Sequence, residues 1–256
     1  MPGTRSVPSA AGARSPRRSR GAWPIKRPVA TMCSHGYRRH DLLRVEPEAW
    51  REMLVATGSL DGLAHGPQRL VEGWAERGLP VIVRRGTVGG DEHTIAVGLP
   101  LPPTLGKLRL GFFIPPEHMA ARVAALSVTE AARSAPAHLR PQVEAAAGLG
   151  RRFGLQPAVF GALLWQHLTG LAYLQPGSDI DLIWPAPPRE SLNELLDDLA
   201  ELDKAGPNRL DGEIILSTGE GANWRELRGA LACPGGTVLV KSMHGAELRC
   251  ARHLFT

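Results

Sequence analysis

The feature that most constrains the fold of this chain lies between Val159 and Trp184, where a small-residue turn, an apolar helical stretch and an aspartate pair follow one another. Asp179 and Asp181 flank a single isoleucine in an apolar run. Because successive side chains of a β-strand point to opposite faces, both carboxylates share one face while Ile180 points to the core. Two adjacent carboxylates repel each other, and Mg²⁺ bound together with substrate phosphates is the usual way to neutralise them. The stretch therefore favours a strand that binds a divalent cation.

The positive charge of the chain is concentrated near its start. The net charge is +5, but residues 1–31 contain seven basic and no acidic residues, which leaves −2 for the remainder. A folded part with this charge is not typical of a nucleic-acid-binding protein, so we expect no nucleic-acid partner. Residues 1–37 are rich in Arg, Pro, Ser and Gly and lack apolar periodicity, which predicts a disordered leader. A transit peptide or a nucleic-acid-binding arm is the alternative to an extension translated from an upstream start, with Met32 just ahead of the ordered residues.

Cysteine usage and hydropathy indicate the compartment. No apolar run reaches the roughly 20 residues that span a bilayer, so we expect no membrane partner. The three cysteines are far apart in the sequence and form no Cys-x-x-Cys pair: Cys33, Cys233 and Cys250. This spacing favours the reducing cytoplasm and argues against a structural zinc site.

Beyond the leader, the patterns predict two modules of α+β or α/β type. Residues 38–115 are expected to form a small N-terminal α+β domain. Its expected helices cover 47–56 and 66–77, and its expected strands cover 79–85, 94–99 and 107–114. Residues 116–153 are rich in Ala, Arg and Leu and are interrupted by prolines, which indicates a connector of short helices.

Residues 154–256 alternate between strand and helix patterns, which predicts a mixed sheet flanked by helices. The expected strands are 158–160, 179–184, 211–216, 237–241 and 247–249, and the expected helices are 163–168, 190–204 and 224–231. Five leucines between 192 and 202 form one apolar stripe on the longest of these helices. Trp165, Trp184 and Trp224 are expected in the core.

The turn at Gly161 and Ala162 follows a predicted strand and opens a helix, where backbone N–H groups suit a phosphate. Taken alone, such a turn usually has only a structural role. Followed after sixteen residues by Asp179 and Asp181, it resembles the signature of the nucleotidyltransferase superfamily, a Gly-Ser or Gly-Gly turn before a strand with two alternate aspartates. In that superfamily the two aspartates and a third carboxylate from a later strand hold a divalent metal against a nucleoside triphosphate.

The resemblance implies that a third carboxylate and several cations complete the site. Glu213 enters an apolar strand and is our first candidate for the third carboxylate, with Asp211 of the same parity as the second. The predicted catalytic residues and metal ligands are therefore Asp179, Asp181 and Glu213.

The predicted phosphate-binding residues are Gly161, Ala162, Arg84, Arg85 and Lys241. Arg84 and Arg85 point in opposite directions at a strand end, so at most one of them faces a cleft. The alternative to phosphate binding, for each of these three cations, is an ordinary solvated charge.

The sequence does not decide the roles of three further polar residues. Arg225 pairs either with a carboxylate or with phosphate. His40 is expected in a polar contact between the modules, and His167 in a core or capping position.

Seven stretches, in order from residue 38 to the C-terminus, are similar to the malonate decarboxylase holo-acyl-carrier-protein synthase family, whose members are also called phosphoribosyl-dephospho-CoA transferases. The stretches are RHDLL at 39–43, PVIVRR at 80–85, VGLPLPP at 97–103, WQHLTGLAYL at 165–174, SDIDLIW at 178–184, LDGEI at 210–214 and NWREL at 223–227. The leader has no part in this resemblance.

The resemblance implies a defined reaction. A serine of the apo acyl carrier protein subunit of malonate decarboxylase attacks triphosphoribosyl-dephospho-CoA, the prosthetic group is attached, and pyrophosphate leaves. It also implies Mg²⁺ or Mn²⁺ as the cofactor and a nucleotidyltransferase-like C-terminal domain. The family's turn commonly reads Gly-Ser, whereas Ala162 follows Gly161 here, so a hydroxyl is missing from the predicted phosphate contact. The alternatives are a nucleotidyltransferase acting on another hydroxyl, and a non-catalytic module that binds dephospho-CoA or the carrier.

Overall fold

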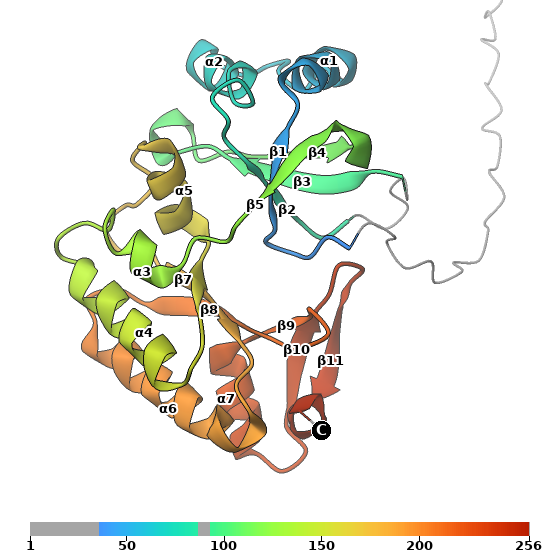
Figure 1. The fold of residues 1–256 in the computed structure, drawn as a ribbon. Helices are drawn as coiled ribbons and strands as arrows, with labels where there is room; N and C mark the ends of the chain where they lie inside the picture. Colours follow the sequence, from blue (N-terminus) through green and yellow to red (C-terminus); the bar gives the residue numbers. More distant parts are fainter. Residues whose placement is uncertain (1–35, 87–92, 256) are drawn as a thin grey trace, which may run out of the picture. The chain divides into compact units, whose positions relative to one another are not determined.

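The computed structural model describes residues 36–86 and 93–255. The predicted leader, apart from Gly36 and Tyr37, lies outside these residues, as do Met32 and Cys33. Two β-sheets organise the described chain, one of five strands and one of six (Figure 1). The predicted α+β class with two modules is confirmed.

The N-terminal sheet is antiparallel throughout and has the strand order β4-β3-β2-β1-β5. Its strands are β1 (Leu42–Val45), β2 (Val81–Val83), β3 (Ile95–Pro100), β4 (Arg109–Ile114) and β5 (Met119–Val123). Helices α1 (Pro47–Thr57) and α2 (His65–Glu72) belong to this domain, and short 3₁₀ helices lie at Pro103–Leu105 and Pro116–His118.

Helix α1 shows how local sequence sets these elements. It begins with Pro47 in its first turn, where a missing N–H costs nothing. It ends at Gly58, whose left-handed φ of 58° lets its N–H bond to the carbonyl of Val55. Trp50 and Leu54, one turn apart, are its buried residues, so this side of α1 covers the domain core.

The C-terminal sheet has the order β11-β10-β9-β8-β7-β6 and is mixed, as predicted. Its strands are β6 (Ala158–Val159), β7 (Ile180–Pro185), β8 (Leu210–Ile215), β9 (Gly221–Asn223), β10 (Thr237–Lys241) and β11 (Ala246–Cys250). Only the pair β7–β8 is parallel among these described strands. A parallel pair needs a crossover connection, and α6 (Arg189–Ala205) provides it.

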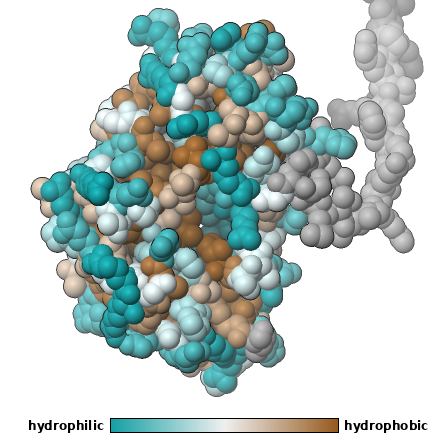
Figure 2. Space-filling model, in the orientation of Figure 1, coloured by the Kyte–Doolittle hydropathy of each residue, from teal (hydrophilic) through white to brown (hydrophobic). Residues whose placement is uncertain are grey.

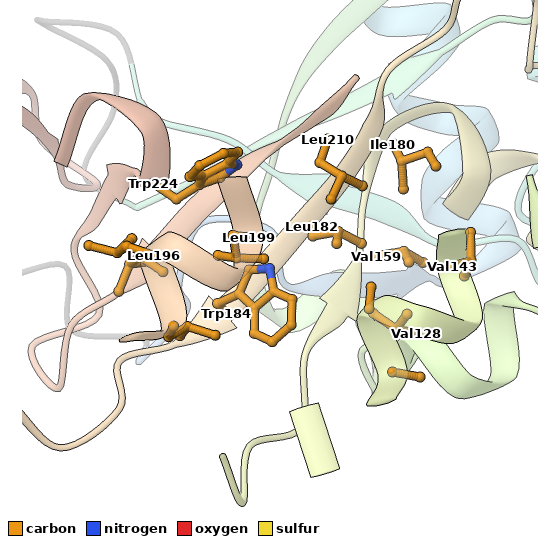
Figure 3. Packing of buried hydrophobic residues seen from close by; sticks show 14 of the residues in the cluster. Val128, Val143, Val159, Ile180, Leu182, Trp184, Leu196, Leu199, Leu210 and Trp224 are labelled. Atoms are coloured by element: carbon orange, nitrogen blue, oxygen red, sulfur yellow. The ribbon is translucent and has the colours of Figure 1, made fainter. Parts of the chain in front are cut away.

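The remaining helices of this half are α3 (Val128–Ala131), α4 (Arg140–Arg152), α5 (Gly161–Thr169) and α7 (Trp224–Ala232), and a 3₁₀ helix covers Ala251–Phe255. Alternation along β7 buries Ile180, Leu182 and Trp184 against the helical layer (Figure 3). The leucine stripe of α6 joins this core, with Leu195, Leu196 and Leu199 at most 1% exposed. The odd-numbered residues of β7 and β8 therefore lie on the opposite face of the sheet, which carries the carboxylates.

Helix α5 connects the two cores. Leu163 and Leu164 belong to the C-terminal cluster, whereas Trp165 belongs to the N-terminal cluster, its ring centroid 5.8 Å from that of Trp74. Tyr173, after α5, donates its hydroxyl to the carbonyl of Pro100 at 2.9 Å. The start of α5 is therefore held by both domains. In the view of Figure 2, apolar residues are visible in the middle of the face, between the regions of the two sheets.

The predicted connector over 116–153 is wrong. Residues Met119–Val123 form β5, which pairs with β1 and completes the N-terminal sheet. Helices α3 and α4 instead supply buried residues to the C-terminal core, among them Val128 and Val143. The strand was missed because β5 lies at the sheet edge, and its Met-Ala-Ala-Arg-Val sequence has no buried residue to produce an apolar alternation.

Other differences from the predicted elements are small. The predicted helix over 66–77 ends at Glu72, and the short strands β1 and β9 were not predicted. The described chain contains no helix that is both long and apolar enough for a membrane span. Cys233 and Cys250 are free thiols.

Candidate active site

The carboxylates of Asp179, Asp181 and Asp211 gather where β7 and β8 begin. The parallel register places Asp181 directly opposite Asp211, and Asp179 immediately precedes β7. Odd parity on both strands puts all three on the face of the sheet that the helical core does not occupy. The strand pairing thus brings together the predicted aspartate pair and the residue that was our second candidate for the third carboxylate.

The turn before α5 contacts this cluster through Asp181. Gly161 has a φ of 63°, and a Cβ atom at this position would overlap the Asp181 carboxylate, so only glycine fits. The backbone N–H of Ala162 donates to that carboxylate, and the N–H of Phe160 donates to the Asp181 carbonyl at 3.0 Å. Because the contact of residue 162 with Asp181 is made by a backbone N–H, it does not depend on the side chain and is present with alanine. A phosphate contact by Gly161 and Ala162 remains a prediction.

Asp181 is a carboxyl group that titrates near neutrality. Burial, together with the charges of Asp211 and Asp179, raises its pKa from the ordinary 3.8 to about 7, although Arg109 on β4 and the hydrogen bond from Ala162 act to lower it. Arg109 is therefore a cation of the N-terminal domain whose charge acts on Asp181. Arg109 could not be predicted from the sequence, because no local pattern shows that its charge acts on Asp181.

Arg209 is a second cation at the cluster that was not predicted from the sequence. Its guanidinium lies 3.3 Å from Asp179 Oδ2 and 3.7 Å from Asp211 Oδ2, and so bridges the two carboxylates. The other oxygen of Asp211 accepts hydrogen bonds from Asn223 Nδ2 at 2.7 Å and from the Gly212 N–H at 2.9 Å. Asp211 is thereby held in one orientation, with Oδ2 facing the charged group.

Glu213, our first candidate for the third carboxylate, lies opposite Ile183 rather than Asp181 in the strand register. It is 5% exposed, and its Oε1 is 3.0 Å from both Arg39 Nη2 and Lys241 Nζ. Its Oε2 is 3.4 Å from His40 Nε2. Burial alone would raise the pKa of Glu213, but the hydrogen bonds from His40 and Arg39 outweigh it and hold the pKa well below its ordinary value.

These contacts tie the residues before β1 to strands β8 and β10 of the other sheet. His40 also packs its ring 4.7 Å from that of Phe160, the residue before the glycine turn. The contacts place Glu213 in an ion cluster between the two domains. Its role as a metal ligand stays a prediction, and the register favours Asp211 for the position beside Asp181.

Two of the three predicted cations, Arg84 and Lys241, have partners other than Asp179, Asp181 and Asp211. Arg84 donates through Nε to the Val97 carbonyl at 3.1 Å and stacks over Phe113 at 5.1 Å, and Arg85 is exposed. Lys241 pairs with Glu213. Phosphate binding by these residues stays a prediction.

Two polar residues left open by the sequence now have partners. Arg225 donates to Asp203 Oδ2 at 2.8 Å, which is the carboxylate alternative. His167 is exposed rather than in the core, and its Nδ1 shares a 2.8 Å hydrogen bond with the hydroxyl of Ser134, which follows α3.

The chemistry of the cluster suits a divalent cation, although the side chains are not arranged as a finished metal site. Asp179, Asp181 and Asp211 are oxygen donors that repel one another, as the raised pKa of Asp181 shows. Within 36–86 and 93–255, no group of three or more His, Cys, Asp or Glu side chains is arranged to hold a metal ion. Arg209 supplies positive charge at this place, so a metal ion would require its guanidinium to move.

Sequence comparison covers nearly all of the chain described above. Residues 38–125 match the family model described as the phosphoribosyl-dephospho-CoA transferase MdcG N-terminal domain, and residues 125–252 match the model of its C-terminal domain. The chain belongs to the phosphoribosyl-dephospho-CoA transferase family. It is accordingly an enzyme, a transferase.

Curated members of the phosphoribosyl-dephospho-CoA transferase family resemble the chain over most of their own length. The protein of that name from Bradyrhizobium diazoefficiens is 34% identical over 230 residues, which are 89% of this chain and 97% of the relative. The one from Xanthomonas euvesicatoria is 34% identical over 190 residues, 74% of this chain and 87% of the relative. The one from Xanthomonas campestris is 31% identical over 202 residues, 79% and 93% of the two chains. No solved structure matches the chain.

The transferase family models meet at residue 125, in the segment where the structure passes from one sheet to the other. Strand β5 ends at Val123 and α3 begins at Val128. The family division therefore agrees with the observed domains better than with the predicted connector over 116–153.

Replacing Asp181 in this transferase by asparagine is expected to flatten the pH dependence of its stability. The pKa of about 7 in the folded protein exceeds the ordinary 3.8, so folding takes up a proton between these values. Stability from this group is fully present below the unfolded pKa and is lost as the pH rises through 7. Between about pH 5 and pH 8 the wild type should lose roughly 2–3 kcal/mol through this carboxylate, and Asp181→Asn should not lose it.

Urea denaturation in EDTA at both pH values measures this difference. Asp197→Asn on the exposed side of α6 is the matched control, because it removes one carboxylate without changing the cluster. Parallel stability profiles for the wild type and Asp181→Asn would show that the Asp181 carboxyl has an ordinary pKa.

Proposed function

We propose that the enzyme transfers the phosphoribosyl-dephospho-CoA group from its triphosphate precursor to a serine of the apo acyl carrier protein subunit of malonate decarboxylase, with release of pyrophosphate. The observation that carries this proposal is the carboxylate cluster of Asp179, Asp181 and Asp211 on one sheet face, in a chain of the transferase family. Such a cluster is suited to a reaction at a phosphorus atom, in which negative charge must be neutralised.

The bond changes define what the side chains must do. The serine Oγ forms a bond to the phosphorus that stays with the prosthetic group, the bond from that phosphorus to the pyrophosphate oxygen breaks, and the serine proton leaves. Asp181 and Asp211 face each other across the parallel strand pair, so a carboxylate oxygen of the cluster is available to accept that proton. A divalent cation, Mg²⁺ or Mn²⁺, held by Asp179, Asp181 and Asp211 would neutralise the triphosphate and orient it for in-line attack.

Arginines from both domains supply the positive charge for the leaving pyrophosphate in this proposal. Arg109 acts electrostatically on Asp181 from β4, and Arg209 bridges Asp179 and Asp211. Arginine binds phosphate in a bidentate manner, which suits a triphosphate chain. Binding of the donor would give Arg209 a phosphate partner in exchange for its two carboxylates.

The experiment is a transfer assay read by mass. The protein is incubated with Mg²⁺, triphosphoribosyl-dephospho-CoA and the apo carrier protein, and the carrier is weighed by mass spectrometry. We expect the carrier to gain the mass of one phosphoribosyl-dephospho-CoA group, and we expect no gain when EDTA replaces Mg²⁺.

Each other outcome identifies an alternative. A mass gain that needs only ATP would favour a nucleotidyltransferase with another donor. Binding of carrier or precursor without any mass gain would favour a non-catalytic binding module. An unmodified carrier in the complete reaction mixture contradicts the proposal.

A further inference from the structure

A groove of about 630 Å³ in the helical layer of the C-terminal domain is lined by basic side chains. Arg133, just after α3, and Arg140 and Arg151, both on α4, line it together with Glu144. Its floor includes Ala132 and Ala147, which are at most 6% exposed. We call this the basic groove; α3 and α4 are visible in Figure 1, and Figure 2 shows hydrophilic residues over this part of the face.

The three arginines of the basic groove are exposed, and none forms an ion pair with another described residue. Arg140 donates only to the carbonyl of Ala135, at 3.4 Å. The neighbouring Arg152 behaves differently, because it pairs with Glu194 and Asp198 on α6. The groove thus presents three guanidinium groups that no ion pair among the described residues holds, although the charge of Arg133 acts on Glu130.

The spacing along α4 suits a row of charges rather than a single one. Arg140 and Arg151 are eleven residues apart, which corresponds to about three turns and about 16 Å along the helix axis, on the same side. One phosphate group is too small to contact both. A protein surface with several carboxylates, such as one side of an acidic helix, matches this length.

Two observations favour an acidic protein over a nucleic acid. Glu144 lies between Arg140 and Arg151 on the same side of α4 and would repel a continuous phosphate backbone. Glu130, which is held by Ser127 in a capping box, adds a second carboxylate near Arg133. A protein surface can place its own basic or neutral residues opposite these carboxylates, whereas a nucleic-acid strand cannot.

The basic groove is connected to the active site through α5. Helix α3 packs against α5, and Ser134 is hydrogen-bonded to His167 near the end of α5. The N–H of Ala162 at the start of α5 donates to Asp181. With nine residues, α5 is about 13 Å long. A small domain of about 100 residues has a radius of gyration of about 13 Å, so it can lie on the groove and still present a side chain to the carboxylates.

We propose that the basic groove is the docking surface for an acidic face of the acceptor protein, the apo carrier subunit. The inference rests on the proposed function for the identity of the acceptor, and on the unpaired arginines for the place where it binds. Attraction between opposite charges at such a surface mainly raises the association rate and is weakened by salt.

The test reverses two charges in the groove. In Arg140→Glu/Arg151→Glu we expect the KM for the apo carrier to rise at least tenfold, while kcat and the KM for the precursor stay within about twofold. The matched control is Arg69→Glu/Arg77→Glu, which makes the same change at two exposed arginines of the N-terminal domain. In the wild type, raising the salt concentration should increase the KM for the carrier, and it should do so less in the groove variant.

A binding measurement separates this inference from the proposed function. Fluorescence anisotropy of labelled apo carrier, titrated with the wild type and both double variants, needs no turnover. Weaker binding to the groove variant alone supports docking there, even if the wild type transfers no group and the proposed function fails. Equal KM values and equal binding for all three proteins overturn the docking surface and leave the transfer reaction intact. Groove-dependent binding of an RNA oligonucleotide with no binding of the carrier overturns it in favour of a nucleic-acid site.

Discussion

Asp181→Asn should lower the rate of group transfer by roughly 10³-fold and leave the protein folded. Asparagine has nearly the same size but neither carries the negative charge that attracts a cation nor accepts a proton. The Ala162 N–H can still donate to the remaining side-chain oxygen, so the turn before α5 is retained. Single-turnover transfer to the carrier, with saturating precursor, measures the rate.

Two further variants make this prediction specific to the carboxylate cluster. Asp211→Asn should cause a comparable loss, because Asp211 lies opposite Asp181 in the register. Asp197→Asn removes a carboxylate from an exposed ion pair with Arg228 and should leave the rate within about twofold of the wild type. If Asp181→Asn retains more than a tenth of the wild-type rate, the cluster is not the reaction centre.

Glu213→Gln should lower the free energy of unfolding by about 3 kcal/mol, because it leaves the partly buried Arg39 and Lys241 without their counter-charge. Glu213 is 5% exposed and contacts Arg39, His40 and Lys241, which come from two separate segments of the chain. Urea denaturation near pH 7, with an unchanged m-value, measures the loss. Glu247→Gln, in an exposed pair with Arg249, is the control and should cost less than about 1 kcal/mol.

A second substitution tests the cause. Adding Lys241→Met to Glu213→Gln removes one of the unpaired cations, so the double variant should recover part of the lost stability. The stabilising effect of Glu213 should be fully present above its ordinary pKa of 4.5 and decline as the pH falls below it, because the folded protein holds this pKa low. A Glu213→Gln variant as stable as the wild type would show that the interdomain ion cluster contributes nothing to folding.

Asp211→Asn and Glu213→Gln together separate two roles, in the reaction centre and in the interdomain ion cluster, that the sequence could not distinguish. Glu213 and Asp211 have the same parity on one strand, and each is a carboxylate in an apolar run. Which of them lies beside Asp181 depends on the register of β8 against β7, and the two strands are separated in sequence by the whole of α6. Long-range register of this kind is set by tertiary packing, so parity alone leaves a two-residue ambiguity.

The cations near the carboxylates were also not predictable from the sequence. Arg84, Arg85 and Lys241 were chosen because they end strands, yet the structure gives Arg84 and Lys241 partners within the protein and leaves Arg85 exposed. Arg109 and Arg209, whose charges act on the carboxylates, lie at strand starts with no distinguishing motif. A charged residue in a sequence carries no indication of which distant residue it will face.

The sequence by itself determined the elements whose signals are local. The alternation around Asp179 and Asp181 specified a strand with both carboxylates on one face, the glycine at 161 specified the turn, and the leucine stripe of α6 specified a buried helix. The ordered stretches from residue 38 onward were enough to indicate the family. Only the tertiary structure decided that β5 belongs to the N-terminal sheet, that Asp211 faces Asp181 and that Glu213 joins the two domains. The physical reason is that strand formation and parity depend on neighbours in the sequence, whereas register, edge pairing and ion pairing depend on residues that meet only when the chain folds.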